Sequence, residues 1–306
     1  MTPRTRQLAQ ELAERLSSTE LDLPGIADIE ARQVLAQHIV DSLRYKRSVQ
    51  LHKTRYSISN TDPRNDNFHP LKAAAYWNDH NNQEEACWLV FLAVHFGEHH
   101  KGGWRYMRDV YGQRSENGLW NWQSVSTNID GFRSWLDQAQ TEIKNDTRKG
   151  GFGNHRKYES LDAYSSRGTG SVIASYIDWI NPPTTQIQRI EDATSSEEDG
   201  FDALFSSLVA IHGFGRLAKF DYIVTLSRLG IIDVEPNTSY LSSATGPLAG
   251  ARLLFTGDKN SKLISPTTLD EAVVSLGREL GLGMDILEDS LCNWQKSPNE
   301  YKKFTG

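Results

Sequence analysis

The residue types best suited to chemistry gather in one short segment near the middle of the chain, "KGGFGNHRKYES" at positions 149–160. Its three glycines expose main-chain amides, and its cations can converge with them on phosphate or on another polar group. Asn154 can donate and accept at once, Tyr158 can stack on a flat base, and Glu159 can orient a cation or assist proton transfer. The segment predicts phosphate contacts from Lys149, Arg156 and Lys157, and base contacts from Asn154, His155, Tyr158 and Glu159. The alternative is a solvated basic loop that Tyr158 anchors to the core.

A second candidate is the stretch "VAIHGFGRLAKFDYIV" at 209–224, in which two glycines stand two residues apart. Gly213 and Gly215 permit a tight turn that a side chain would obstruct. The helix predicted over 216–229 begins at this turn, and its unpaired N–H groups and its dipole attract an anion. We expect Gly213, Gly215 and Arg216 to hold a backbone phosphate. The alternative is an ordinary corner between two helices.

A third polar cluster is "LEDSLCNWQKSP" at 287–298, whose helical spacing places Asp289, Asn293 and Lys296 on one face. An acid, an amide and a cation on consecutive turns suit the lining of a base pocket. They suit a surface salt-bridge ladder equally well, and the residues alone favour the ladder.

The elements that must position these residues are predicted to be helices. Apolar residues recur at spacings of three and four, and no run of alternating residues indicates a strand. The predicted helices span residues 5–16, 27–45, 71–79, 83–96, 127–143, 169–180, 201–212, 216–229, 268–280 and 284–295. The segment "ATGPLAG" at 244–250 predicts a turn followed by a further helix.

Two connections are rich in Pro, Asn, Asp and Ser, namely "NTDPRNDNFHP" at 60–70 and "INPPTTQIQRIEDATSSEEDG" at 180–200. The second is the better candidate for a lobe boundary or linker. We therefore predict an all-α protein with two helical lobes. Residues 1–185 form an N-terminal lobe with the polar central loop, and residues 186–306 form a C-terminal lobe with the glycine hairpin.

Composition limits the partners and cofactors. The formal net charge is −6 and the pI is about 5.9, so a polyanion must be held by a local patch or by backbone amides. Cys87 and Cys292 are too few for a four-thiolate metal site, and they favour a reducing cytoplasm. The longest apolar run, "CWLVFLAVHF", is half the length of a membrane span. We expect no metal, no cofactor, no membrane contact and no obligate protein partner.

Several segments together resemble a known family. The glycine hairpin is similar to the helix-hairpin-helix of DNA glycosylases. Further segments resemble the alpha-glutamyl/putrescinyl thymine pyrophosphorylase family, clade three, from about residue 40 onward; they are "EEACWLVFLAVHFG", "GGFGNHRKYES", "FGRLAKFDYIVTLSRLG", "YLSSATGPLAGARLLF" and "LEDSLCNWQKSP". The resemblance implies a DNA glycosylase-like fold and a substrate among the hypermodified pyrimidines of phage DNA. Related enzymes are thought to transfer amino acids or amines to an activated 5-hydroxymethyl base, and similar ones to act as antiviral glycosylases.

The resemblance also supplies catalytic candidates. In that superfamily a catalytic aspartate follows the second hairpin helix, and Asn237 stands at its position here. Nearby acids can replace the missing charge, and we expect Asp233 first and Asp221 second. Asp221 lies one turn into the second hairpin helix, where it can instead be a cap or an internal hydrogen-bond acceptor. The same resemblance makes Asp289 and Asn293 candidates for the base pocket.

These residues predict a DNA glycosylase that flips a bulky, hypermodified pyrimidine out of double-stranded DNA and excises it as an antiviral defence. A glycosylated 5-hydroxymethylpyrimidine is one such base. Two alternatives stay open. A transferase adds an amino acid or amine to an activated 5-hydroxymethyluracil base, and a non-catalytic reader only binds modified DNA. The amide at position 237 favours these alternatives, whereas the dense polar motifs favour catalysis.

Overall fold

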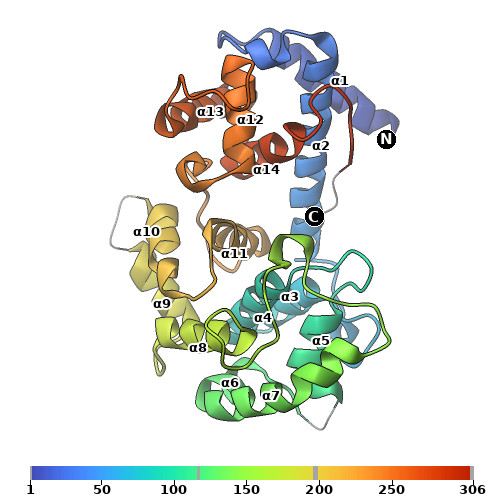
Figure 1. Cartoon of the computed structure of the whole chain (residues 1–306), viewed down its shortest axis with the longest axis vertical. Coiled ribbons are helices and arrows are strands. Elements are labelled where there is room, and N and C mark those ends of the chain that lie inside the picture. Colours follow the sequence, from blue (N-terminus) through green and yellow to red (C-terminus); the bar gives the residue numbers. More distant parts are fainter. Residues whose placement is uncertain (1, 116–117, 196–198, 304–306) are drawn as a thin grey trace. The chain divides into compact units, whose positions relative to one another are not determined.

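The computed structural model describes residues 2–115, 118–195 and 199–303, and throughout these ranges the regular structure is helical. It consists of fourteen α-helices and six short 3-10 helices (Figure 1), with no strand in the same ranges. Two isolated β-bridges join His99 to Gly103 and Ser160 to Gly168. The all-α class predicted from the apolar spacing is confirmed.

The chain forms two compact units, one of residues 1–48 and 235–305 and the other of residues 49–234. The helices that lie wholly or mostly in the first unit are α1 (Pro3–Ser17), η1 (Pro24–Ile26), α2 (Ile29–Leu51), η6 (Leu241–Ser243), α12 (Gly246–Thr256), α13 (Pro266–Leu280) and α14 (Met284–Trp294). The α-helices of the second unit are α3 (Pro70–Asp79), α4 (Gln83–Phe96), α5 (Arg105–Tyr111), α6 (Trp122–Thr127), α7 (Ile129–Asn145), α8 (Thr169–Ile180), α9 (Gln186–Thr194), α10 (Gly200–Ser207) and α11 (Arg216–Leu229). Its 3-10 helices are η2 (Ile58–Asn60), η3 (Gln113–Ser115), η4 (Asn154–Arg156) and η5 (Leu208–Ala210).

The first unit has a core to which both ends of the chain contribute. Leu12 of α1, Leu35 of α2, Leu254 of α12, Leu276 of α13 and Trp294 of α14 are buried in one apolar cluster. Burying each such side chain contributes about 1.5–3 kcal/mol. This shared core holds together segments that are more than two hundred residues apart.

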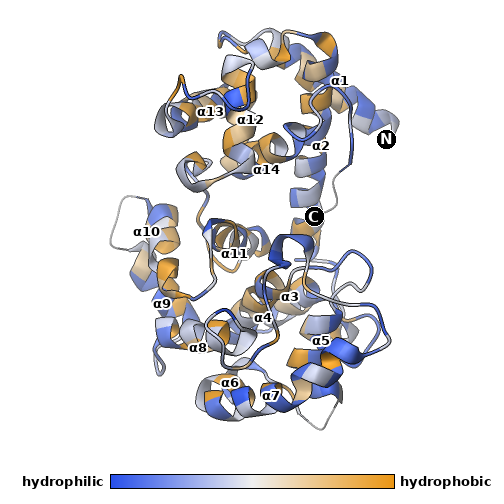
Figure 2. Cartoon of the chain, in the orientation of Figure 1, coloured by the Kyte–Doolittle hydropathy of each residue, from blue (hydrophilic) through white to orange (hydrophobic). Residues whose placement is uncertain are grey.

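The second unit is organised around α4. Every residue of this helix from Glu85 to Phe96 is buried, and Figure 2 shows the helix as mostly hydrophobic. A helix that is apolar all round belongs in the interior. Accordingly, α4 packs against α3, α5, α6, α9 and α11.

The ends of the helices follow from local side chains. Asn82, Asn121, Asn128, Thr185 and Ser265 each accept a hydrogen bond from a first-turn N–H group at the start of their helix. Glycines with a left-handed backbone end α11, α12 and α13, where a β-carbon would be strained. These caps explain where the helices begin and end.

The ten predicted helices and the helix expected after "ATGPLAG" are all present. Three short helices were not predicted, namely α5, α6 and α9. Helix α9 lies inside the polar stretch 180–200, which the sequence predicts to be a connection, and residues 196–198 of that stretch lie outside the described residues.

The two units do not meet at the predicted boundary between residues 185 and 186, because helices on both sides of it pack against each other. Helices α9 and α11 pack on α4, so residues 186–234 belong with residues 49–185. The first 48 residues belong with the C-terminal helices through their shared core. Across the described ranges, no helix is both long enough and apolar enough to cross a membrane.

Candidate functional site

The central polar loop is held at the C-terminal end of α4. The Gly153 N–H donates to the Phe96 carbonyl at 2.8 Å, and the Arg156 Nε donates to the Val94 carbonyl at 2.7 Å. Carbonyls in the last turn of a helix have no partner within the helix, and a cation there also matches the helix dipole. Arg156 is therefore buried because it completes the end of α4.

The end of the loop is fixed by α8. The carbonyl of Ser160 accepts from both the N–H and the hydroxyl of Thr169, each at 2.8 Å. The same hydroxyl is 3.0 Å from Nε2 of His95, which is buried. Burial, and next the charge of Arg156, lower the pKa of His95 to about 3, so this imidazole is neutral at physiological pH.

The start of the loop is fixed by Arg105 of α5. Its guanidinium donates to the carbonyls of Ile143 and Lys149 and pairs with Asp109 at 2.9 Å. A β-carbon on Gly150 would overlap this guanidinium, so a larger residue there would have to displace Arg105 from its bonds. The predicted loop is thus a fixed element whose two ends and middle are each hydrogen-bonded to a helix.

The glycine hairpin joins α10 and η5 to α11. Gly213 has a φ of 68°, and the Gly215 N–H donates to the Gly213 carbonyl at 2.9 Å. Phe214 is buried between the two glycines, and the His212 N–H donates to the buried hydroxyl of Ser175. Gly215 is the N-cap of α11 and provides no side-chain cap. The turn predicted from the two glycines is present, and α11 begins where predicted.

The structure brings the central loop and α11 together. Arg156 Nη2 lies 2.9 Å from Asp221 Oδ2, and the Asp221 side chain is 42% exposed. The Glu159 carboxylate lies beside the hairpin, since a β-carbon on Gly213 would be 3.6 Å from Glu159 Oε2. We call Arg156, Glu159, Gly213 and Asp221 the loop–hairpin site.

The two acids of the loop–hairpin site differ in their surroundings. Burial raises the pKa of Glu159, although Arg156 and Arg167 oppose that effect. Asp221 instead forms an ion pair with Arg156 and keeps part of its surface in water. The loop–hairpin site thus contains one carboxyl group that retains its proton more readily, Glu159, and one carboxylate held by a cation, Asp221.

The other loop residues predicted to bind a ligand are on the surface. Asn154, His155, Lys157 and Tyr158 are exposed, and Tyr158 has 83% of its surface accessible. The Lys157 ammonium lies 5.1 Å from the centre of the Tyr158 ring. Tyr158 therefore does not anchor the loop to the core as the solvated-loop alternative expects, although the exposure of these four side chains agrees with that alternative.

The remaining backbone-binding candidates also lie in the second unit. Lys149 is exposed, while its carbonyl is held by Arg105. The Arg216 guanidinium stacks on Phe220 with 4.9 Å to the ring centre, on the first turns of α11.

Three predicted residues belong to the first unit. Asn237 is exposed on the segment before η6. Asn293 donates to Asp289 at 2.9 Å and accepts from Lys296, so the predicted ladder runs along α14. The second carboxylate oxygen of Asp289 accepts from the buried Ser42 of α2 at 2.5 Å. These bonds give Asp289 and Asn293 a structural role in joining α14 to α2.

Asp233, the first choice for the catalytic acid, lies just after α11 in the second unit. It is exposed, and it has no hydrogen bond or ion pair to any residue in the described ranges. Its catalytic role remains a prediction, as does that of Asn237. Among the acids named from the sequence in the second unit, Asp221 and Glu159 are held next to other predicted site residues, and Asp233 is not.

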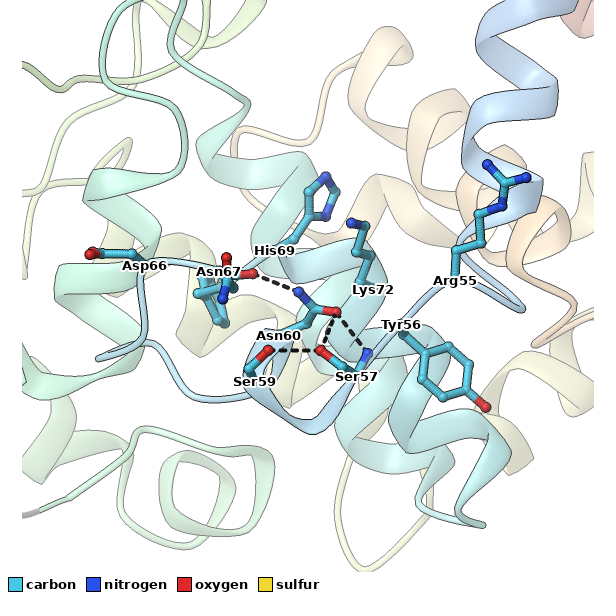
Figure 3. Close-up of a pocket in the computed structure, with 10 residues that line it drawn as sticks. Arg55, Tyr56, Ser57, Ser59, Asn60, Asp66, Asn67, His69 and Lys72 are labelled. Carbon is cyan, nitrogen blue, oxygen red and sulfur yellow. Dashed lines mark hydrogen bonds between the residues drawn. The ribbon is translucent and has the colours of Figure 1, made fainter.

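One feature was not predicted from the sequence. A hollow with a volume of about 500 Å3 lies at the start of α3 in the second unit, and we call it the α3 hollow (Figure 3). Its walls include Arg55, Ser57, Asn60, His69 and Lys72. The only sequence signal was the polar connection 60–70, whose turn-forming residues resemble those of any loop.

No group of three or more His, Cys, Asp or Glu side chains in the described ranges is arranged to hold a metal ion.

Comparison with protein families gives one match. The family described as alpha-glutamyl/putrescinyl thymine pyrophosphorylase clade 3 matches residues 30–306, which is nearly the whole chain. The name of this family is that of enzymes that process modified thymine. Neither the comparison with curated proteins nor that with solved structures gave a match.

Proposed function

The chain belongs to the alpha-glutamyl/putrescinyl thymine pyrophosphorylase clade 3 family, and from this premise we propose that it excises a bulky, hypermodified pyrimidine from double-stranded DNA. An enzyme of this kind serves as a defence against phages that carry such bases. Family membership supports an enzyme that acts on modified thymine. The choice of excision rests on the loop–hairpin site.

The observation that carries the proposal is the contact between Arg156 and Asp221. These residues are 65 positions apart, and their 2.9 Å ion pair joins the loop suited to a base to the hairpin suited to a phosphate. An enzyme that acts on a base within a duplex must grip the backbone and rotate the nucleotide out of the stack. The loop–hairpin site supports both tasks within one unit.

The backbone grip is assigned to the start of α11. The N-cap Gly215 provides no side-chain acceptor, and the space where its β-carbon would be is open. The first-turn N–H groups of Leu217 and Ala218 have no partner within the helix and can donate to a phosphate oxygen. This arrangement explains how a chain with a net charge of −6 can bind a polyanion.

The chemistry is assigned to the two acids. Water attacks C1′ of the everted nucleotide and loses one proton to solvent, while the bond from C1′ to the pyrimidine N1 breaks and its electron pair leaves with the base. The Asp221 carboxylate stabilises the positive charge that develops on the sugar. Glu159, whose pKa is raised by burial, donates a proton to the departing base. Asn154, His155 and Tyr158 contact the base, and Arg156 holds Asp221 in position.

This assignment places Asp221 before Asp233 and Asn237. Asp221 is fixed by a buried arginine, whereas Asp233 is exposed and has no partner in the described ranges. Preorganised charges stabilise a transition state better than mobile ones, because they require no reorganisation during the reaction. Mutagenesis of Asp221, Asp233 and Asn237 therefore tests directly which of the three is the catalytic residue.

Group transfer is the second candidate function, and the family description favours it. The words alpha-glutamyl and putrescinyl denote groups attached to thymine. In that reaction an amine attacks the activated methylene of the base and displaces its leaving group, while the bond between base and sugar stays intact. Transfer therefore requires a co-substrate, and excision requires only water.

The test uses duplexes that each carry one modified pyrimidine, such as glycosylated 5-hydroxymethylcytosine or 5-hydroxymethyluracil. Excision predicts release of the modified base, detected by mass spectrometry, and a strand that alkali cleaves at that position. Duplexes with ordinary cytosine or thymine should remain intact. An added amine on an intact strand would establish transfer, and unchanged DNA with every substrate, despite tight binding, would establish a reader.

A further inference from the structure

The α3 hollow takes no part in the proposed excision, yet it is lined by cations. Arg55 follows α2 and Lys72 lies in the first turn of α3. Neither makes an ion pair or hydrogen bond with any residue that the structure describes. Figure 3 shows the side chains of His69, Lys72 and Arg55 extending in the same direction. Two unpaired cations at one concave surface leave an excess of positive charge there.

Two imidazoles lie near Lys72. The rings of His52 and His69 lie 4.7 Å apart, and both are close to Lys72. Burial, followed by His52 and Lys72, lowers the pKa of His69 to about 4. Nδ1 of His69 is buried and has no hydrogen-bond partner. A bound anion would supply the counter-charge that the described residues around the hollow do not.

Neutral donors face the same space. The hydroxyls of Ser57 and Ser59 line the hollow but bond to each other at 2.7 Å, and Ser57 also donates to Asn60 Oδ1, whereas α3 begins at His69 without a side-chain cap. Pro70 at the first position of this ten-residue helix has no N–H, so the N–H groups of Leu71 and Lys72 remain available for an anion. Together with the two cations, these amides suit an anion with several acceptor oxygens.

The wall of the hollow is held rigid by Asn60. Its Nδ2 donates to the Asn67 carbonyl at 2.7 Å, and its Oδ1 accepts from the Ser57 N–H at 2.8 Å (Figure 3). Asp66 is the one acid in the described lining, and its side chain is fully exposed and lies 3.7 Å from Arg108. Its charge is therefore screened by water and partly matched from outside the hollow.

We propose that the α3 hollow binds a phosphate group. Arg55 and Lys72 provide the counter-charges, and the first-turn amides of α3 provide the neutral donors. The phosphate can belong to a free ion, such as inorganic phosphate or diphosphate, or to the backbone of DNA. This inference goes beyond the excision reaction, and a titration with free ions tests it without DNA.

The experiment compares the full chain with three variants, Arg55→Gln, Lys72→Gln and Lys144→Gln. Lys144 is the matched control, because it is an exposed lysine of the same unit on α7 and bonds only to Gln140. Circular dichroism first establishes that each variant is folded. Inorganic phosphate and diphosphate are then titrated by calorimetry, and an unmodified duplex is titrated at several salt concentrations.

A free-ion site predicts saturable binding of phosphate or diphosphate that is about tenfold to a hundredfold weaker in Arg55→Gln and Lys72→Gln but unchanged in Lys144→Gln. A DNA-backbone site predicts no binding of the free ions. In that case Arg55→Gln and Lys72→Gln each weaken duplex binding, and each reduces by about one the slope of the logarithm of the binding constant against the logarithm of the salt concentration. Lys144→Gln changes neither. Either result supports the proposal. If the hollow variants match Lys144→Gln in both titrations, the proposal is wrong, and a failure of base release would leave this conclusion unaffected.

Discussion

Replacing Asp221 by Asn separates a catalytic role from a structural one. The amide is nearly the same size and can still accept from Arg156 Nη2, which donates to Asp221 at 2.9 Å. Only the negative charge is lost. Because the proposed reaction depends on that charge and the fold does not, activity and stability should respond very differently.

The expected magnitudes follow from exposure. The Asp221 side chain is 42% exposed, so solvent screening limits the worth of its ion pair to about 1 kcal/mol or less. Removing one preorganised group that stabilises a transition-state charge lowers the rate by about a hundredfold to a thousandfold. The free energy of unfolding of Asp221→Asn should therefore lie within about 1 kcal/mol of the wild-type value, whereas the variant should lose most of its turnover.

The assay measures single-turnover base release alongside urea unfolding. Asp233→Asn is the matched control, because it makes the same chemical change at an exposed acid with no partner in the described ranges. It should retain activity. If Asp233→Asn loses turnover and Asp221→Asn keeps it, the reasoning from the ion pair is refuted and Asp233 takes the catalytic role.

Four further predictions follow from the same contacts. Gly215→Asp should stabilise α11 by a few tenths of a kcal/mol, about the usual gain from an N-cap acid over glycine. Gly215→Asp should also weaken duplex binding about tenfold to a thousandfold, because one or two charge-assisted hydrogen bonds to the phosphate are lost. Gly215→Ala has open space for its β-carbon and should bind the duplex normally. Equal affinities of the two variants would exclude the phosphate contact at α11. Asn154→Ala, His155→Ala and Tyr158→Ala should lower turnover more than affinity, and Lys157→Ala should lower affinity and its salt slope; equal effects on binding and turnover would show that the loop only grips the backbone. Burial raises the pKa of Glu159, so activity should fall as the pH rises through this raised pKa. In Glu159→Gln the pH–activity profile should lose this fall at high pH. An unchanged profile would show that Glu159 is not the proton donor. Because burial holds the pKa of His95 at about 3, only the unfolded state binds a proton at this imidazole between about pH 6.5 and 3, so the free energy of unfolding falls as the pH falls. In His95→Gln this fall should be smaller by about 1.4 kcal/mol per pH unit. Identical pH slopes in the two proteins would contradict the buried neutral imidazole.

The helices could be predicted because local signals define them. Helices α4, α8 and α11 have the predicted bounds, since apolar spacing and a glycine or asparagine cap coincide at their ends. Helix α9 was missed because its segment follows two prolines and is polar. Its Thr185 cap is a weak signal, and it is fixed by tertiary contacts, chiefly the buried Gln186 bonded to Glu84.

The candidate site could be predicted only in part, because its contacts are long-range. The residue types of the loop and hairpin were visible in the sequence, and so was the turn at Gly213. The pairing of Arg156 with Asp221 was not, since nothing local links residues 65 positions apart. Likewise, the sequence of the polar connection 60–70 does not indicate that Asn60 bonds to Ser57 and Asn67 and so forms the wall of a hollow.

The central claim is that the bond between sugar and base is broken by water, and a reaction in water enriched in oxygen-18 tests it directly. The substrate is a duplex with one glycosylated 5-hydroxymethylpyrimidine, and the intact mass of the product strand is measured. Excision predicts that the strand loses the modified base and carries one oxygen-18 hydroxyl at C1′ when it is measured before transfer to ordinary water, in which this hemiacetal oxygen would exchange. A strand that keeps its base and gains the mass of an amine, with no oxygen-18 on the sugar, would contradict the claim.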